Sequence, residues 1–125
     1  MSHDEKISVT VRSEYREEHS DAASGRFAFA YHITISNHGT EAAQLISRHW
    51  VITDGNQRRE EVRGLGVVGE QPRIPPGASH AYSSGAVLPT AVGSMEGSYQ
   101  FVRDDGRVFK VPIPAFRLAV PRALN

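Results

Sequence analysis

The segment from residue 27 to residue 36 alternates between large apolar side chains and small or polar ones. Five large apolar residues occupy every second position: Phe27, Phe29, Tyr31, Ile33 and Ile35. Successive side chains of an extended strand point to opposite faces of a sheet, so this spacing predicts a β-strand with one buried face. No other segment of the chain shows so long an alternation.

Shorter extended segments separated by turn signals fill most of the remaining chain. We expect strands at residues 7–11, 44–53, 58–63, 79–84, 95–103, 108–113 and 116–120. The segment 44–53 carries apolar side chains on both faces, so the pattern does not indicate which face is buried. Residues 16–25 are charged or small and predict a solvent-exposed loop. No segment of the sequence predicts a helix of three turns.

Seven or eight short strands with regular turn signals are typical of an all-β protein built as an antiparallel two-sheet β-sandwich. A small β-barrel is the alternative closure. Residues 64–78, rich in glycine and proline, predict a long connection without a regular ladder, which suits a crossover between two sheets. A length of 125 residues fits one domain spanning residues 1–125.

Composition excludes several classes of function. The chain has no cysteine, which excludes disulfides, thiol nucleophiles, iron–sulfur clusters and cysteine-bound zinc. Fourteen basic residues balance fourteen acidic ones, whereas a nucleic-acid-binding module usually has a basic excess. No apolar run is long enough to insert into a membrane. The polar start at residues 1–6 lacks a secretory signal, so we expect a cytoplasmic protein.

Residues 64–69 read Gly-Leu-Gly-Val-Val-Gly and match the GxGxxG pattern of dinucleotide-binding proteins. In those proteins the last glycine opens a helix that holds the pyrophosphate. Pro72, Pro75 and Pro76 follow too soon for such a helix, so we expect no cofactor. Two interpretations remain. The segment is a tight connection between strands, or its amides form a concave anion site with Arg73 nearby.

The histidines and serines give weak signals for chemistry. On neighbouring strands His32 and His49 could lie side by side and face water, and a metal site would then need a third ligand from elsewhere, His80 or a carboxylate. No HxH or HExxH motif is present. The serines after Tyr82 lack the GxSxG motif, and no histidine has a defensible triad geometry with them, so we expect no enzymatic activity.

Several segments together resemble one family. Residues 64–77 read GLGVVGEQPRIPPG, residues 82–85 read YSSG, residues 47–54 read SRHWVITD and residues 114–118 read PAFRL. In this combination the chain resembles the ApaG family. The resemblance implies a fibronectin type III or immunoglobulin-like β-sandwich. It also implies an association with cobalt resistance and magnesium efflux, and a role in binding, because related domains occur in F-box proteins and in a polymerase-interacting protein.

These observations favour a binding module that acts indirectly on divalent-cation homeostasis by contacting an unidentified protein or a small phosphate-type anion. The expected contact residues are Gly64, Gly66, Gly69, Arg73, Tyr82 and Ser84. A homodimer is possible through pairing of edge strands from two copies of the chain. One alternative is a protein that binds a divalent metal directly through His32 and His49. A second alternative is a phosphate- or nucleotide-binding protein, and a third is a hydrolase that acts on nucleoside polyphosphates.

Overall fold

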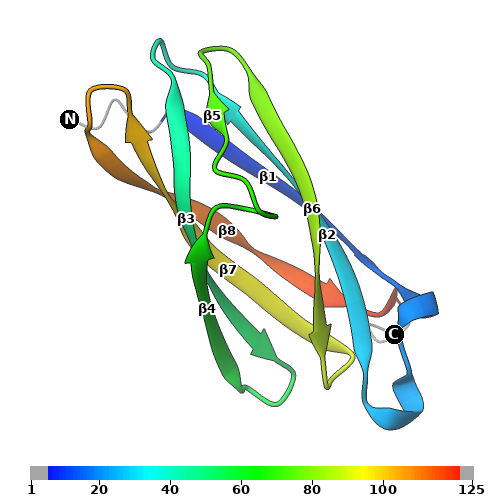
Figure 1. Cartoon of the computed structure of the whole chain (residues 1–125). Helices are drawn as coiled ribbons and strands as arrows, with labels where there is room; N and C mark the ends of the chain where they lie inside the picture. Colours follow the sequence, from blue (N-terminus) through cyan, green and yellow to red (C-terminus); the bar gives the residue numbers. More distant parts are fainter. Residues whose placement is uncertain (1–5, 122–125) are drawn as a thin grey trace.

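Two antiparallel β-sheets pack face to face in the computed structural model, which describes residues 6–121 (Figure 1). The first five residues, on which the expectation about the N-terminus partly rests, lie outside this range. The strands are β1 (Ile7–Tyr15), β2 (Phe27–Asn37), β3 (Ala43–Asp54), β4 (Arg59–Leu65), β5 (Arg73–Ile74), β6 (Ser79–Leu88), β7 (Val92–Arg103) and β8 (Val108–Ala119).

The strand order confirms the sandwich and excludes the barrel, because the two sheets stay separate. One sheet has the order β1-β2-β6, and the other has the order β4-β3-β7-β8 with β5 paired to β3. The segment between β1 and β2 contains two single-turn 3-10 helices, η1 (Glu17–His19) and η2 (Ala22–Ser24). Among residues 6–121 no helix has the length and apolar character needed to span a membrane.

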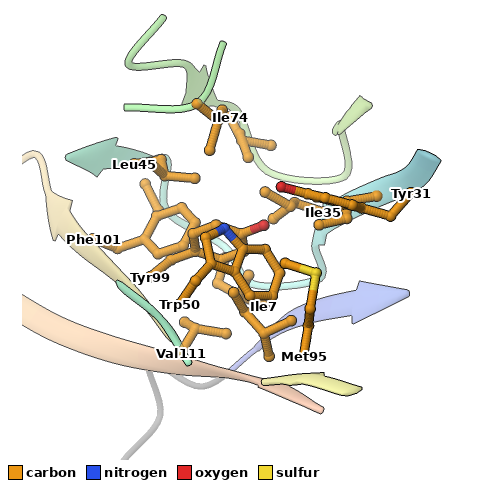
Figure 2. Close-up of a cluster of buried hydrophobic side chains, with 14 of the residues drawn as sticks. Ile7, Tyr31, Ile35, Leu45, Trp50, Ile74, Met95, Tyr99, Phe101 and Val111 are labelled. Atoms are coloured by element: carbon orange, nitrogen blue, oxygen red, sulfur yellow. The ribbon is translucent and has the colours of Figure 1, made fainter. Parts of the chain in front are cut away.

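The alternating segment of β2 supplies a large part of the core, as predicted. Ile33 and Ile35 are almost completely buried, and Tyr31 packs edge-on against Trp50 of β3, with ring centroids 5.4 Å apart. Figure 2 shows this pair among the buried side chains between the sheets. Burying one such large apolar side chain stabilises the fold by about 1.5–3 kcal/mol.

β8 is one strand, whereas the sequence pattern was interpreted as two. Its buried side changes from Phe109, Val111 and Ile113 to Leu118, and the pairing with β7 shifts register between Met95 and Gly97. A β-bulge adds one residue to one side of a ladder and so reverses the alternation without ending the strand. The same strand carries Pro112 and Pro114, which an edge strand tolerates because its outer backbone groups need no partner.

A second bulge explains why the sequence pattern does not indicate which face of β3 is buried. The pairing of β3 with β7 skips Ile46, between Leu45 and Ser47. Leu45 is buried before the bulge and Trp50 is buried after it, although an even strand would place them on opposite faces. The long connection then crosses between the sheets as predicted, but it includes the short strand β5, which the sequence did not indicate.

Candidate functional site

Residues 64–71, hereafter the glycine-rich loop, form a tight hairpin instead of a helix. Val67 and Glu70 exchange two backbone hydrogen bonds of 2.7 and 3.0 Å. Between them, Val68 and Gly69 have positive φ angles of 48° and 79°, the combination found in a type I′ turn. The expectation that no helix starts here is confirmed, and so is the interpretation as a tight connection.

The bulge in β3 holds the glycine-rich loop in place. The carbonyl oxygen of Ile46, the bulged residue, accepts hydrogen bonds from the Gly66 amide at 2.8 Å and from the Gln71 side chain at 3.0 Å. Val67 inserts its side chain into the core and is only 1% exposed. The loop is therefore anchored at its backbone and at one apolar side chain.

Arg48 of β3 is a second anchor, which the sequence analysis missed. Its Nη1 donates to the carbonyl oxygens of Leu65 at 3.1 Å and of Gly66 at 3.0 Å. A Cβ atom on Gly64 would lie 2.8 Å from that nitrogen, so a glycine is needed for the guanidinium to reach these carbonyls. Arg48 lies two positions before the buried Trp50 on the same face of β3, and this placement of an arginine was the available signal.

The other two glycines of the motif have different reasons to be glycine. Gly66 has a φ of 65°, and a Cβ there would overlap the carbonyl oxygen of Glu70. Gly69 has a φ of 79° but open space around it, so only its backbone conformation favours glycine. The GxGxxG spacing of residues 64–69 thus follows from the hairpin, which needs Gly66 and Gly69, and from the contact of Arg48 with Gly64.

A cavity of about 340 Å³ separates the glycine-rich loop from β6. Figure 1 shows the chain between β4 and β5 extending from the five-stranded sheet toward β6. The cavity brings together predicted and unpredicted residues, namely Tyr31, Arg48, Trp50, Leu65, Val67, Val68, Gly69, Tyr82, Ser83 and Ser84. Two of its apolar side chains point to solvent: Leu65 is 74% exposed and Val68 is 64% exposed.

Tyr82, at the wall of this cavity, links the two sheets. Its hydroxyl lies 2.5 Å from the hydroxyl of Tyr99 on β7. Burial raises the pKa of Tyr82 to about 12, and burial raises the pKa of Tyr99 still further above its usual value. Both side chains are therefore neutral hydroxyls near neutral pH, and Arg48 is the charged side chain in the cavity lining.

Arg73 is not among the residues around the cavity beside β6. Its Nε and Nη2 donate to the carboxylate of Asp104 at 3.2 and 2.5 Å, and the guanidinium holds the pKa of that carboxyl below its usual value. The amides of Gly66, Val67 and Glu70 also donate to backbone carbonyls, so these three are not available to an anion.

His32 and His49 do not lie side by side, so the arrangement considered for a metal site does not occur. His32 is on β2 of the three-stranded sheet and His49 is on β3 of the five-stranded sheet, each on the outer face of its sheet. The residues between β2 and β3 carry the chain from one sheet to the other and form no hairpin, so the two strands do not pair. Within the described residues, no group of three metal-ligating side chains is present.

The structure gives each histidine another neighbour. Nδ1 of His32 lies 2.6 Å from the hydroxyl of Ser83, although the sequence paired no histidine with the serines of this segment. Glu14 is 3.8 Å from the other ring nitrogen but bonds Arg16 at 3.0 Å, and Arg16 lowers the pKa of Glu14. Nε2 of His49 lies 2.9 Å from Glu61, and this hydrogen bond lowers the pKa of Glu61.

The family model and the similar sequences identify one family. The family model described as the ApaG domain matches residues 17–103, which is more than half of the chain. A Pseudomonas paraeruginosa protein named Protein ApaG is 58% identical over 120 residues, covering 96% of this chain and 95% of the relative. A Pseudomonas putida protein of the same name is 57% identical over the same share of each chain.

Solved structures agree with the sequence comparisons. A crystal structure of a Bordetella pertussis protein superposes with a TM-score of 0.90 at 50% identity, covering 93% of this chain and 94% of the other. An X-ray structure of a structural-genomics target superposes with a TM-score of 0.89 at 47% identity, covering 94% and 89%. Sequence identity at this level, over nearly the whole of both chains, indicates a shared family as well as a shared fold.

Proposed function

Because this chain belongs to the ApaG domain family, we propose that it is a non-enzymatic binding module that recognises a protein partner through the cavity beside β6. The contact surface comprises the exposed part of the glycine-rich loop and the facing segment of β6. Its members are Leu65, Val68, Gly69, Tyr82, Ser83 and Ser84.

The observation that carries this proposal is a pair of large apolar side chains held in water by a fixed backbone. Leu65 and Val68 are 74% and 64% exposed, while Arg48, the bulge at Ile46 and the buried Val67 hold the loop between and around them. Val68 also has a positive φ, which is unfavourable for a β-branched residue. An exposed apolar side chain kept in a strained conformation is typical of a contact site.

The shape of the surface favours an extended segment of the partner. Within residues 6–121, β6 (ten residues) pairs with β2 on one side only, so its other edge offers backbone groups that no strand of this range pairs. An extended peptide can add to such an edge by main-chain hydrogen bonds while its side chains occupy adjacent pockets. The cavity between Tyr82 and Val68 is suited to one apolar side chain of that segment, and the hydroxyl of Ser84 to a polar one.

A binding role also accommodates the association with cation efflux that the family resemblance implies. The chain would influence divalent-cation homeostasis indirectly, through a transporter or regulator that it contacts. Arg73 is paired with Asp104, so we place it outside the contact surface.

Photo-crosslinking from a chosen position tests the proposal. A photoreactive phenylalanine analogue is introduced at position 68 in the full chain, and the adducts formed in cells are identified by mass spectrometry. Position 108 provides a matched control, because Val108 is 56% exposed but lies on β8. We expect a discrete partner adduct from position 68 that is absent from position 108.

Two further variants sharpen the outcome. Leu65→Asp should abolish the adduct because it places a charge beside the apolar contact, whereas Arg73→Ala should leave it unchanged. An adduct with a second copy of this chain alone, or the same adducts from positions 68 and 108, would overturn the proposal.

A further inference from the structure

The outer face of the five-stranded sheet contains a second cavity, of about 360 Å³, which we call the outer trough. Its lining residues are Ser47, Arg48, His49, Arg63, Gly64, Leu65, Ser98, Gln100 and Lys110. None of them is acidic. The outer trough shares Arg48 and Leu65 with the cavity beside β6, but its floor lies on the opposite side of the sheet from the core.

Strand register builds the outer trough from two neighbouring rows of side chains. One row runs across the four strands as Leu65, Ser47, Gln100 and Lys110, which are paired in this order. The next row runs as Arg63, His49, Ser98 and Pro112. Each row has one short serine on a central strand, Ser47 on β3 or Ser98 on β7, beside a longer side chain on the other, and the two serines lower the middle of the face.

The outer trough offers hydrogen-bond donors more than acceptors. Ser47 donates its hydroxyl to Oε1 of Gln100 at 3.3 Å, so the acceptor of that amide already has one donor from the protein. The amide nitrogen of Gln100 and the ammonium of Lys110 have no protein partner within residues 6–121. Surfaces in which donors exceed acceptors favour anionic ligands.

Positive charge stands at both ends of the outer trough. Lys110 lies on β8 and Arg63 on β4, with β3 and β7 between them. Three strand intervals separate β4 from β8 by about 14 Å, and Lys110 and Arg63 lie in neighbouring rows. Arg63 shares Glu61 with His49, at 3.3 and 2.9 Å, and Glu96 lies one row further along the sheet beside Val51. The acidic side chains therefore border the outer trough on one side without lining it.

From this arrangement we propose that the outer trough binds a small molecule with two phosphate-type groups joined by a polar spacer. Lys110 and Arg63 each bind one anionic group, while Ser47, Ser98 and Gln100 contact the spacer. A volume of about 360 Å³ lies within the usual range for small-molecule sites and is too small for a folded partner. This site shares Leu65 with the proposed protein contact surface, but Lys110 and Arg63, which bind the anionic groups, lie outside that surface.

Isothermal titration with fructose 1,6-bisphosphate and with fructose 6-phosphate tests the proposal at low ionic strength. The two probes differ by one phosphate, so their comparison isolates the need for both cationic ends. We expect the bisphosphate to bind at least about tenfold more tightly than the monophosphate. Amide chemical shifts of Ser47, Ser98 and Gln100 should move on titration, while those around Val68 should not.

Charge-matched variants distinguish specific binding in the outer trough from nonspecific electrostatic attraction of the anion. Lys110→Gln and Arg63→Gln should each weaken binding of the bisphosphate by about fivefold or more. Arg117→Gln and Arg59→Gln remove the same charge from β8 and β4 outside the outer trough, and should change affinity by less than about twofold. Equal affinity for the two probes, equal losses in all four variants, or no binding would each overturn the proposal.

Discussion

The guanidinium of Arg48 occupies the space that a side chain at Gly64 would need: a Cβ on Gly64 would lie 2.8 Å from Nη1 and 2.9 Å from Cζ of that arginine. From this position Arg48 binds the carbonyl oxygens of Leu65 and Gly66. The first glycine of the motif and an arginine sixteen positions earlier in the chain therefore act as a pair.

We expect Gly64→Ala to lower the free energy of unfolding by about 1–2 kcal/mol, because Arg48 must move and lose its two carbonyl contacts. In an Arg48→Ala background the same substitution should cost almost nothing, since no guanidinium remains to be displaced. Urea unfolding of the four proteins of this double-mutant cycle measures the coupling. Additive effects of the two substitutions would contradict the pairing.

The second and third glycines of the motif should respond unequally to alanine. Gly66→Ala meets the carbonyl oxygen of Glu70 and has an unfavourable φ, so we expect a loss of at least about 2 kcal/mol. Gly69→Ala meets open space and should lose only about 1 kcal/mol from its φ. Thermal or urea unfolding compares them, and a Gly69→Ala protein as unstable as Gly66→Ala would argue against this account of the hairpin.

Val68→Asn should raise the free energy of unfolding by about 1 kcal/mol, because asparagine adopts positive φ more readily than a β-branched residue does. The same change should weaken partner capture by a photoreactive probe at position 65, since it removes an exposed apolar contact. Val68→Thr is the control: it stays β-branched, so it should reduce capture without gaining stability. A gain in stability with Thr would show that φ strain is not the cause.

The Tyr82–Tyr99 pair should make stability depend on alkaline pH. The folded protein holds the pKa of Tyr82 at about 12 and raises that of Tyr99, whereas unfolded tyrosines titrate near 10. Above pH 10 the unfolded chain therefore loses these protons first, so the free energy of unfolding should fall as the pH rises from 10 toward 12.

The double variant Tyr82→Phe, Tyr99→Phe should show a smaller fall over the same pH range. Urea unfolding at pH 8 and pH 10.5 measures both proteins, and the comparison removes the contribution of lysine titration. Single variants should be less stable than the double one, because each leaves one buried hydroxyl without its partner. Parallel pH profiles for the wild type and the double variant would contradict this assignment.

Regular alternation made most of the fold predictable, and bulges account for the main errors. The strand at residues 27–36 follows from local pattern alone. The bulges in β3 and near the end of β8 reverse the alternation, and a sequence shows such a reversal only as mixed faces or as an apparent break. The two-residue strand β5 is too short to leave any pattern.

The candidate site was only partly predictable, because its members meet through tertiary structure. The glycines and Tyr82 stand out in the sequence, and the structure brings Gly69 and Tyr82 to one cavity. Arg48 was missed because its partners are backbone carbonyls, which carry no residue identity. His32 and His49 were placed together because strands consecutive in the chain usually pair, and here the chain changes sheets between them.

Continuity of β8 makes the two long sides of the sandwich unequal. Along one side β8 lies against β1, with a hydrogen bond of 2.9 Å from the Ser13 hydroxyl to the Arg117 carbonyl. Along the other side a short hairpin rests on β3 and faces β6 across a cavity. A change in the length of β8 would disturb its contact with β1, whereas substitutions in the exposed part of the hairpin can alter what binds there and leave that contact unchanged.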